Sequence, residues 1–180
     1  MSPRVRVFVG SSLDGFIAGP DDDLSFLDPP EGAQLEDDHG FGQLLEETGA
    51  LLMGRRTYDV VTSFDVPWPY GERPVLVATR RPLEPVQPTV RAISGSITEL
   101  IQQAKAAAAG KDVYLDGGDL IRQALTAGLV EELTITVVPI AIGRGVPLLA
   151  GLEQAQRLER VAVKALSHGM VQLVYRPQGD

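Results

Sequence analysis

The feature of this sequence that most constrains its fold is a repeated order: a short apolar run, then glycine, then helical spacing. The run at 50–53 is followed by a segment of helical spacing at 54–64, and the run at 112–115 by another at 119–127. Short, continuous apolar runs are typical of strands that are buried on both faces. Strands that alternate with helices in this way predict an α/β protein with a mostly parallel sheet.

Other segments extend the same pattern. Further strands are expected where short apolar or alternating runs occur, at 4–10, 74–79 and 132–139. A helix that carries Phe41 on its apolar face is expected to end at Gly49, and a capping box at Ser96 and Glu99 opens another helix. The tail at 157–176 alternates and is predicted to form an antiparallel hairpin. We find no internal sequence repeat and no inter-domain linker, so residues 1–180 are predicted to form a single domain.

The composition argues against several classes of function. The chain has 180 residues, a formal net charge of −8 and no cysteine. An acidic chain of this kind does not suit a nucleic-acid-binding protein, which needs a basic face. The absence of cysteine excludes a disulfide framework and a thiolate metal site, and no other metal site is expected. No segment has the length of a membrane span or the form of a signal peptide, so a cytoplasmic protein is expected.

The junction at residues 53–58 predicts a phosphate site. Here Gly54, Arg55, Arg56 and Thr57 follow a buried strand and begin a helix. The free N–H groups at a helix start favour an anion, and guanidinium groups add charge-assisted hydrogen bonds. The alternative is a helix whose basic residues merely face water. Cations at a helix start oppose the helix dipole, however, and a bound anion would offset that cost.

A second junction has the same form. Gly117 and Gly118 stand between the strand at 112–115 and the next helix, and paired glycines allow a ligand to approach the backbone closely. The spacing differs from the GxGxxG fingerprint, and Asp116 and Asp119 would repel a pyrophosphate unless they point away. Thr79 and Arg80, at the end of the strand at 74–79, are a weaker indication of a nucleotide site. Arg80 beside an adenosine 2′-phosphate would favour NADPH over NADH, and a solvated arginine is the alternative.

Together these junctions resemble the dihydrofolate reductase superfamily, and most closely the branch that contains the reductase domain of riboflavin biosynthesis. The segments that carry the resemblance occur in order along nearly the whole chain, at 12–27, 51–59, 75–80, 113–125 and 128–149. The resemblance implies a dihydrofolate-reductase-like three-layer fold with about eight strands in the central sheet and helices on both faces. It also implies NADPH bound across the carboxyl ends of several strands.

The resemblance assigns roles to individual residues. Phosphates and adenosine would be held by Gly54, Arg55, Arg56, Thr57, Thr79, Arg80, Asp116, Gly117, Gly118, Asp119, Leu120 and Ile121. Ile17 and Ala18 would flank the nicotinamide, with Val9 and Gly10 beneath it. The segment 18–28 would form a lid, and lid motion limits turnover in many such enzymes.

The same resemblance implies an acidic residue that supplies a proton to the substrate. Reduction of a C=N bond needs a proton, which a carboxyl group or an oriented water supplies. An ungapped match places Asp38 at that position, with Asp37 as a lesser candidate. A helix cap is the alternative for Asp38. The substrate would contact Gly10, Phe26, Phe41 and Thr136, although Phe41 also suits the core and Thr136 also suits an ordinary strand position.

The resulting hypothesis is an NADPH-dependent reductase that transfers hydride to a nitrogen heterocycle such as a pteridine or dihydrofolate. One alternative is the reductase of riboflavin biosynthesis that acts on a 5-amino-6-ribosylamino-pyrimidinone phosphate. That enzyme needs a second phosphate site, for which Arg144 is the best single candidate. Another alternative is a nucleotide- or pterin-binding protein without catalysis. The resemblance also implies a homodimer, formed through the sheet edge and the tail.

Overall fold

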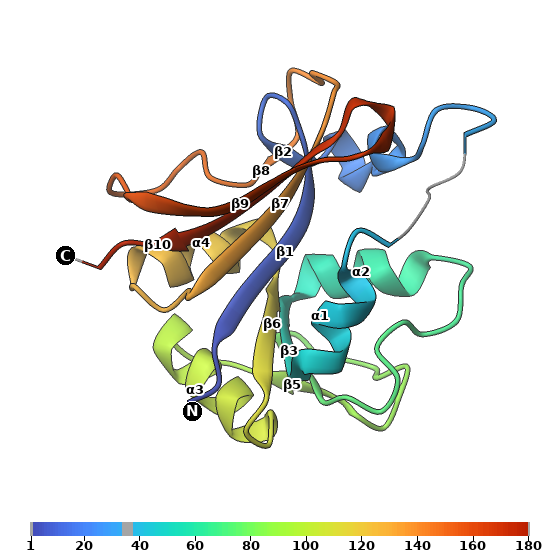
Figure 1. The fold of residues 1–180 in the computed structure, drawn as a ribbon. Coiled ribbons are helices and arrows are strands. Elements are labelled where there is room, and N and C mark those ends of the chain that lie inside the picture. The colour runs from blue at the N-terminus through green and yellow to red at the C-terminus, as the bar shows by residue number, and fades with distance from the viewer. Residues whose placement is uncertain (1, 34–37, 180) are drawn as a thin grey trace.

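The computed structural model describes residues 2–33 and 38–179. Its centre is an eight-stranded sheet in the order β5-β4-β3-β6-β1-β7-β10-β9 (Figure 1). The sheet strands are β1 (Val5–Ser12), β3 (Thr48–Gly54), β4 (Val75–Ala78), β5 (Val90–Ile93), β6 (Asp112–Asp116), β7 (Glu132–Val138), β9 (Leu158–Ala165) and β10 (Val171–Pro177). The strands from β5 to β7 pair in parallel, and β10 pairs antiparallel with both β7 and β9. This arrangement confirms the predicted mostly parallel sheet with an antiparallel C-terminal hairpin.

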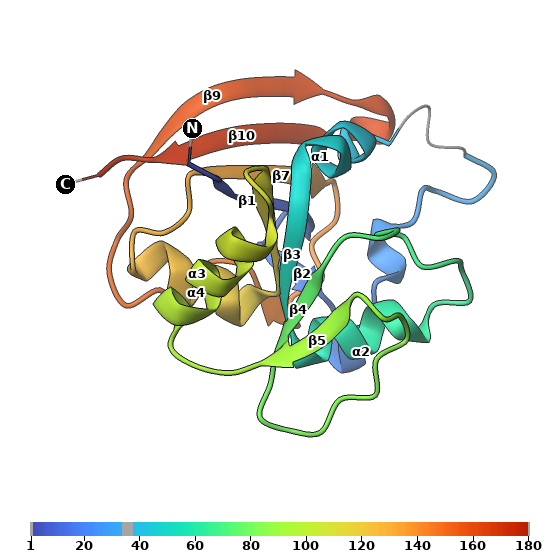
Figure 2. The ribbon, with the colours of Figure 1, turned by 90° about the horizontal axis from the view of Figure 1, so that it is seen from below.

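Helices cover both faces of the sheet (Figure 2). They are α1 (Phe41–Glu47), α2 (Arg55–Ser63), α3 (Ile97–Ala107) and α4 (Gly118–Thr126). Side chains alternate along β3, so Leu51 and Met53 pack in one apolar cluster with α1 and α2, while Leu52 packs in the other with α3 and α4. The predicted three-layer architecture is therefore confirmed, and each face of the sheet has its own core.

Three strands were not predicted. They are the edge strand β5 and the two-stranded pair of β2 (Phe16–Ala18) and β8 (Val146–Pro147). β2 and β8 have three and two residues, which is too short for an alternating pattern to show. In β5 the middle residues Arg91 and Ala92 are exposed, so this strand lacks the continuous apolar character of its neighbours.

Gly49 has a different role from the predicted one. α1 ends at Glu47 with Thr48 as its cap, and Gly49 already lies within β3. A Cβ on Gly49 would lie 2.0 Å from the carbonyl oxygen of Ala108, just after α3. Glycine is therefore required here because the end of α3 approaches the backbone of β3 too closely for any side chain.

At the amino ends of β1, β6 and β7, a network of ion pairs joins the strands. Asp112 accepts hydrogen bonds from the backbone N–H of Arg4 at 3.0 Å and from its guanidinium at 2.6 Å. Arg6 pairs with Glu132 at 2.9 Å and also with Glu47. The network lies at the opposite end of the parallel strands from their carboxyl ends, so it holds the sheet together without entering the cavity described below.

This network predicts a dependence of stability on pH. Burial raises the pKa of Asp112, but the hydrogen bonds and charge of Arg4 outweigh it, and the pKa lies below its ordinary value. The carboxylate therefore stabilises the fold above the unfolded-state pKa of about 3.9, and this contribution is lost as the pH falls further. Asp112→Asn should lower the free energy of unfolding by about 1–2 kcal/mol at pH 7. Urea unfolding should show the difference shrinking below about pH 4. The exposed Asp65→Asn is the control, and a difference that is independent of pH would contradict the assignment.

The described helices are short. The longest of them, α3, has 11 residues, whereas a membrane span needs about 20. None of the described helices is both long and apolar enough to cross a bilayer. Within 2–33 and 38–179 there is also no group of three or more histidine or acidic side chains that could hold a metal ion.

Candidate nucleotide and substrate site

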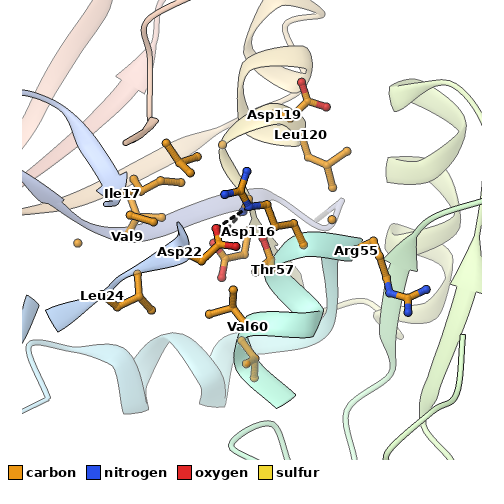
Figure 3. Close-up of a pocket in the computed structure, with 18 of the residues that line it drawn as sticks. Val9, Ile17, Asp22, Leu24, Arg55, Thr57, Val60, Asp116, Asp119 and Leu120 are labelled. Carbon is orange, nitrogen blue, oxygen red and sulfur yellow. Dashed lines mark hydrogen bonds and ion pairs between the residues drawn. The ribbon is translucent and has the colours of Figure 1, made fainter. Parts of the chain in front are cut away.

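A cavity of about 720 Å³ opens at the carboxyl ends of β1, β3 and β6. The start of α2 and the start of α4 form two of its walls, and residues of β2, β8 and the segment 22–27 form another. In Figure 3, Asp116 and Thr57 lie near the centre, Val9, Ile17 and Leu24 lie on one side, and Asp119 and Leu120 lie above. Parallel strands end together at one edge of a sheet, which is where α/β proteins bind their ligands.

The first wall is the start of α2. Its N-cap, Gly54, has extended backbone and offers no side-chain cap, and the first turn holds no acidic residue. The first N–H groups of a helix lack partners within that helix. In α2 they therefore remain available to a ligand, together with the positive end of the helix dipole.

The second wall is the start of α4. Its N-cap, Gly117, has a φ of 103° and also offers no side-chain cap. β3 and β6 are neighbours in the sheet, so the two helix starts lie side by side. A Cβ on Gly117 would lie 2.8 Å from Thr57 Oγ1 and 3.5 Å from the backbone nitrogen of Gly54. Two sets of unpaired donors thus converge on one small volume, as a pyrophosphate requires.

The two arginines of α2 both line the cavity, but each has a protein partner. Arg55 donates to Asp59 Oδ1 at 2.8 Å and to the carbonyl of Pro82 at 2.7 Å, and Figure 3 shows it directed away from the other labelled residues. Arg56 pairs with Asp22 Oδ1 at 2.5 Å. Asp22 belongs to the predicted lid, so this ion pair connects the lid to the start of α2.

The two acids of the second junction differ in environment. Asp116 accepts the N–H of Gly117 at 2.8 Å and the hydroxyl of Tyr114 at 3.3 Å, and burial raises its pKa above the ordinary value. Asp119 is exposed and accepts a hydrogen bond from Gln123 on its own helix at 2.7 Å. Burial therefore weakens the repulsion expected at Asp116, whereas Asp119 lines the cavity and shares its carboxylate with Gln123.

One end of the cavity is largely apolar and aromatic. Val60 and Val61 come from α2, Phe64 is its C-cap, and Phe8 comes from β1. Tyr70 and Tyr114 add hydroxyl groups to this wall, and Tyr114 donates to the carbonyl of Phe8 at 3.0 Å. An apolar wall with a few placed polar groups is typical of a pocket for a planar ligand.

Most of the sequence-predicted site residues line this one cavity. They are Val9, Gly10, Ile17, Ala18, Gly54, Arg55, Arg56, Thr57, Asp116, Gly117, Gly118, Asp119 and Leu120. These residues come from four separate segments of the chain. The structure therefore brings together residues that the sequence linked only through the resemblance, although their individual roles remain predictions.

Asp38 lies elsewhere. It is exposed and outside the cavity lining, and its carboxylate accepts the N–H groups of Gly40 at 2.9 Å and Gly42 at 2.7 Å. These two backbone hydrogen bonds lower the pKa of Asp38 below its ordinary value. The N-cap of α1 is Gly40, so Asp38 is not the N-cap that the sequence offered as the alternative. Its carboxylate instead accepts the N–H of Gly40 and that of Gly42 in the first turn of α1. Asp37 lies outside the described residues.

Six other predicted residues also lie outside the lining. Phe41 packs against Phe8 and Tyr114, with ring centroids 5.8 and 6.1 Å apart, and so belongs to the core behind the wall. Thr136 is buried in β7, where it accepts a hydrogen bond from Gln172 at 3.1 Å. The remaining four are the fully buried Ile121, the partly buried Phe26 and the two residues after β4, Thr79 and Arg80.

Several lining residues were not indicated by the sequence. Outside the predicted lid they are Phe8, Val60, Val61, Phe64, Tyr70, Ala78, Tyr114, Arg122, Gly145, Val146 and Pro147. Val60, Val61 and Phe64, from α2 and its C-cap, follow Thr57 at intervals of three, four and seven, so the helical period could have identified them. Tyr70 comes from an irregular loop, and no local pattern marks it.

Comparisons with known proteins agree with this geometry. The family model of the RibD C-terminal domain matches residues 3–172. A Shewanella sp. PV-4 crystal structure, named for riboflavin biosynthesis, is 32% identical, covers 98% of this chain and 99% of its own, and gives a TM-score of 0.84. The uncharacterized Bacillus subtilis protein YwjB is 28% identical over 97% of this chain and 98% of its own. Dihydrofolate reductase from Enterococcus faecalis, complexed with NADP(H), shares the fold at 15% identity, with a TM-score of 0.67 and 99% of both chains covered.

Proposed function

Since the chain belongs to the family of the RibD C-terminal domain, we propose that it is an NADPH-dependent reductase that transfers hydride to a nitrogen heterocycle of the pteridine type. The observation that carries this proposal is the convergence of two uncapped helix starts at the carboxyl ends of adjacent strands. The apolar pocket beside them provides space for a planar ring. A dinucleotide and a heterocycle fit these two parts of one cavity.

The residues present fit the proposed cofactor. A Cβ would fill the space between Gly117 and Thr57, so glycine keeps this cradle open for a group that needs backbone donors. We assign the pyrophosphate to the N–H groups that follow Gly54 and Gly117, with Thr57 as a hydroxyl donor. Ile17 and Ala18 would flank the nicotinamide, above Val9 and Gly10. Bound NADPH would supply the hydride, and the protein would supply binding, orientation and a proton.

For the proton, the geometry supports Asp116 in preference to Asp38. Asp116 lines the cavity and burial raises its pKa, whereas both carboxylate oxygens of the exposed Asp38 already accept backbone N–H groups, those of Gly40 and Gly42. A protonated carboxyl group near neutral pH is what general acid catalysis needs. Tyr114 would hold the Asp116 carboxyl in place through its hydroxyl, which lies 3.3 Å from Oδ2.

The proposal is tested first by binding and then by turnover. Isothermal titration of the intact protein with NADPH should give a saturable isotherm of one site per chain. Loss of NADPH absorbance should then be followed with dihydrofolate, other reduced and oxidised pteridines, and pyrimidines. The absence of NADPH binding would refute the reductase proposal. Binding without turnover on this panel would favour the non-catalytic nucleotide-binding alternative.

The preference for NADPH over NADH provides a specific prediction. Arg80 is exposed and lies two residues after Ala78, which lines the cavity at the end of β4. If its guanidinium binds the 2′-phosphate, Arg80→Ala should weaken NADPH binding about tenfold and leave NADH binding unchanged. Titration of both nucleotides measures this ratio. Arg160→Ala, on the edge strand β9, is the matched control, and an equal loss for the two nucleotides would contradict the assignment.

A second candidate is the riboflavin-type reaction, which the family and the Shewanella relative favour. Its substrate carries a phosphate and would need a cation beyond those for the cofactor. Arg122, one of three lining cations, already donates to the carbonyl of Pro147 at 2.5 Å, and Arg144 is exposed outside the lining. The activity panel should therefore include the phosphorylated ribosylaminopyrimidine and its dephosphorylated form. Turnover of the phosphorylated compound alone would favour this candidate.

We also propose a homodimer and a cytoplasmic location, as the family resemblance implies. β9 is an edge strand of the sheet, and its Val161 and Val163 are exposed by 44% and 48%. An exposed edge with apolar side chains suits pairing with a second copy of the chain. Light scattering of the purified protein measures the mass directly, and a monomeric mass would overturn the dimer proposal.

A further inference from the structure

Tyr70 is held rigidly in the cavity wall. Its side chain is only 4% exposed, and its ring packs edge-on against Trp68 with centroids 5.0 Å apart. Its carbonyl accepts hydrogen bonds from the backbone of Arg73 at 3.3 Å and from the Arg73 guanidinium at 3.2 Å. Arg73 in turn donates to the carbonyl of Leu45, so the loop that carries Tyr70 is fixed to the end of α1.

Tyr70 is buried and lines the cavity. Within residues 2–33 and 38–179, no group forms a hydrogen bond with its hydroxyl. Burial and the nearby Asp116 charge raise the pKa of Tyr70 well above its ordinary value, so the group keeps its proton. Fully buried hydroxyls are almost always paired within the protein, so an unpaired hydroxyl in a cavity wall is available to a ligand.

The hydroxyls of two other buried tyrosines nearby form hydrogen bonds within the protein. Tyr58 donates to the carbonyl of Glu84 at 3.1 Å and accepts the N–H of Val86 at 3.0 Å. Tyr114 donates to the carbonyl of Phe8. Tyr70 is as buried as these two, with exposed fractions of 4%, 3% and 5%, yet its hydroxyl makes no such bond among the described residues.

We propose that Tyr70 determines substrate specificity by donating its hydroxyl hydrogen bond to a carbonyl oxygen on the ring of the bound heterocycle. The inference rests on the proposed function, because the ring must lie against the same wall. Asp116 stands in that wall beside Tyr114, so a donor hydroxyl and a carboxyl group face the same space. A planar ring with a carbonyl oxygen and a neighbouring N–H offers complementary groups to both, whereas an unsubstituted aromatic ring does not.

A fixed, unpaired donor discriminates strongly between substrates. A ligand that lacks the acceptor leaves the hydroxyl unpaired in the complex, while a ligand that carries it gains a preformed hydrogen bond. Removal of the hydroxyl should therefore weaken binding of carbonyl-bearing rings about tenfold and affect rings without a carbonyl little. Stability should not fall, because no intramolecular hydrogen bond is lost.

The experiment uses two probes of similar shape. Lumazine is a fluorescent pteridine with ring carbonyls, and quinoxaline is a fused ring without them. Both are titrated against the full chain with and without saturating NADP⁺, and the melting temperature of each variant is recorded. Tyr70→Phe removes the hydroxyl in question. Tyr58→Phe is the matched control, since it removes a hydroxyl that has two protein partners.

The expected result is that Tyr70→Phe weakens lumazine binding about tenfold, leaves quinoxaline and NADP⁺ binding unchanged and does not lower the melting temperature. Tyr58→Phe should lower the melting temperature by about 2–4 °C and leave lumazine binding unchanged. Equal lumazine affinity in Tyr70→Phe and the native protein, or no lumazine binding at all, would overturn the assignment of Tyr70. Failure to bind NADP⁺ would instead overturn the proposed function, and the titration without NADP⁺ would still decide the role of Tyr70.

Discussion

Replacement of Asp116 by asparagine is expected to lower the rate constant of hydride transfer about 100-fold or more while leaving NADPH affinity within about twofold. The carboxyl group lies in the cavity wall, accepts the N–H of Gly117 and contacts the hydroxyl of Tyr114. Asparagine has nearly the same shape and can keep these contacts. It cannot donate the proton that the reduced ring nitrogen needs, so the loss should appear in the chemical step and not in binding.

The pH dependence of the rate distinguishes this role from a structural one. Burial raises the pKa of Asp116, so the protonated form extends to higher pH than for an exposed carboxyl group. The rate of the native protein should be highest below this raised pKa and fall as the pH increases through it. Asp116→Asn should lose this limb of the profile, and stopped-flow measurement of NADPH oxidation over a range of pH would record both curves.

The control for this prediction is a carboxyl group outside the cavity. Asp65 is exposed in the segment after α2 and does not line the cavity, so Asp65→Asn should retain the native rate and the native pH profile. A rate for Asp116→Asn within about threefold of the native value would remove Asp116 as the proton donor. If Asp38→Asn then lowered the rate with the same pH signature, the candidate from the sequence would be restored.

The half of the site that we propose for the nucleotide could be predicted because each of its parts is contiguous in sequence. A buried strand, a glycine and a helix start occupy adjacent positions, and the geometry of a helix start follows from the backbone alone. Residues 54–57 and 116–120 are therefore recognisable without knowledge of the fold, and all nine line the cavity. Their meeting depends only on β3 and β6 becoming neighbours in the sheet.

The substrate half could not be predicted in the same way, because its wall is assembled from distant segments. Phe8, Tyr70 and Tyr114 lie on two strands and a loop, and each has an ordinary local sequence. An ungapped match to the family placed Asp38 at its acid. In the structure Asp38 instead accepts the N–H of Gly42 in the first turn of α1, which begins at Phe41. Spacing along the chain does not determine which way a side chain points when a loop precedes a helix.

Prediction of the fold was limited in the same way, because some of its features depend on tertiary contacts. Continuous apolar runs identified β3, β4 and β6, which are buried on both faces. The edge strand β5 was not predicted because it lacks a continuous apolar run: Arg91 and Ala92, which point to opposite faces of the sheet, are both exposed. Gly49 was assigned to a helix end because glycine is common there, yet the approach of Ala108 is what requires it. That approach is a tertiary contact, and no local pattern encodes it.

Replacement of Gly117 by alanine is expected to lower NADPH affinity about 30-fold or more. The residue has a φ of 103°, which L side chains rarely adopt, and the new Cβ would lie 2.8 Å from Thr57 Oγ1. Relief of this contact must move Thr57 or the start of α4, so the donors of the two helices would no longer converge on one phosphate. Displacement of Thr57 or of the start of α4 would remove several charge-assisted hydrogen bonds to the phosphate at once.

Gly128→Ala separates this effect from backbone strain. Gly128 also has a positive φ, of 66°, but no atom lies within 4 Å of its Cβ position, and it follows the far end of α4. Both variants should therefore lose about 1 kcal/mol of stability or more through strain, which urea unfolding measures. Only Gly117→Ala should also lose NADPH affinity in isothermal titration. Equal NADPH affinity of the two variants would refute the assignment of the nucleotide to the convergence of α2 and α4. In that case the steric block that only Gly117→Ala introduces would have no effect on binding beyond the backbone strain that both variants share.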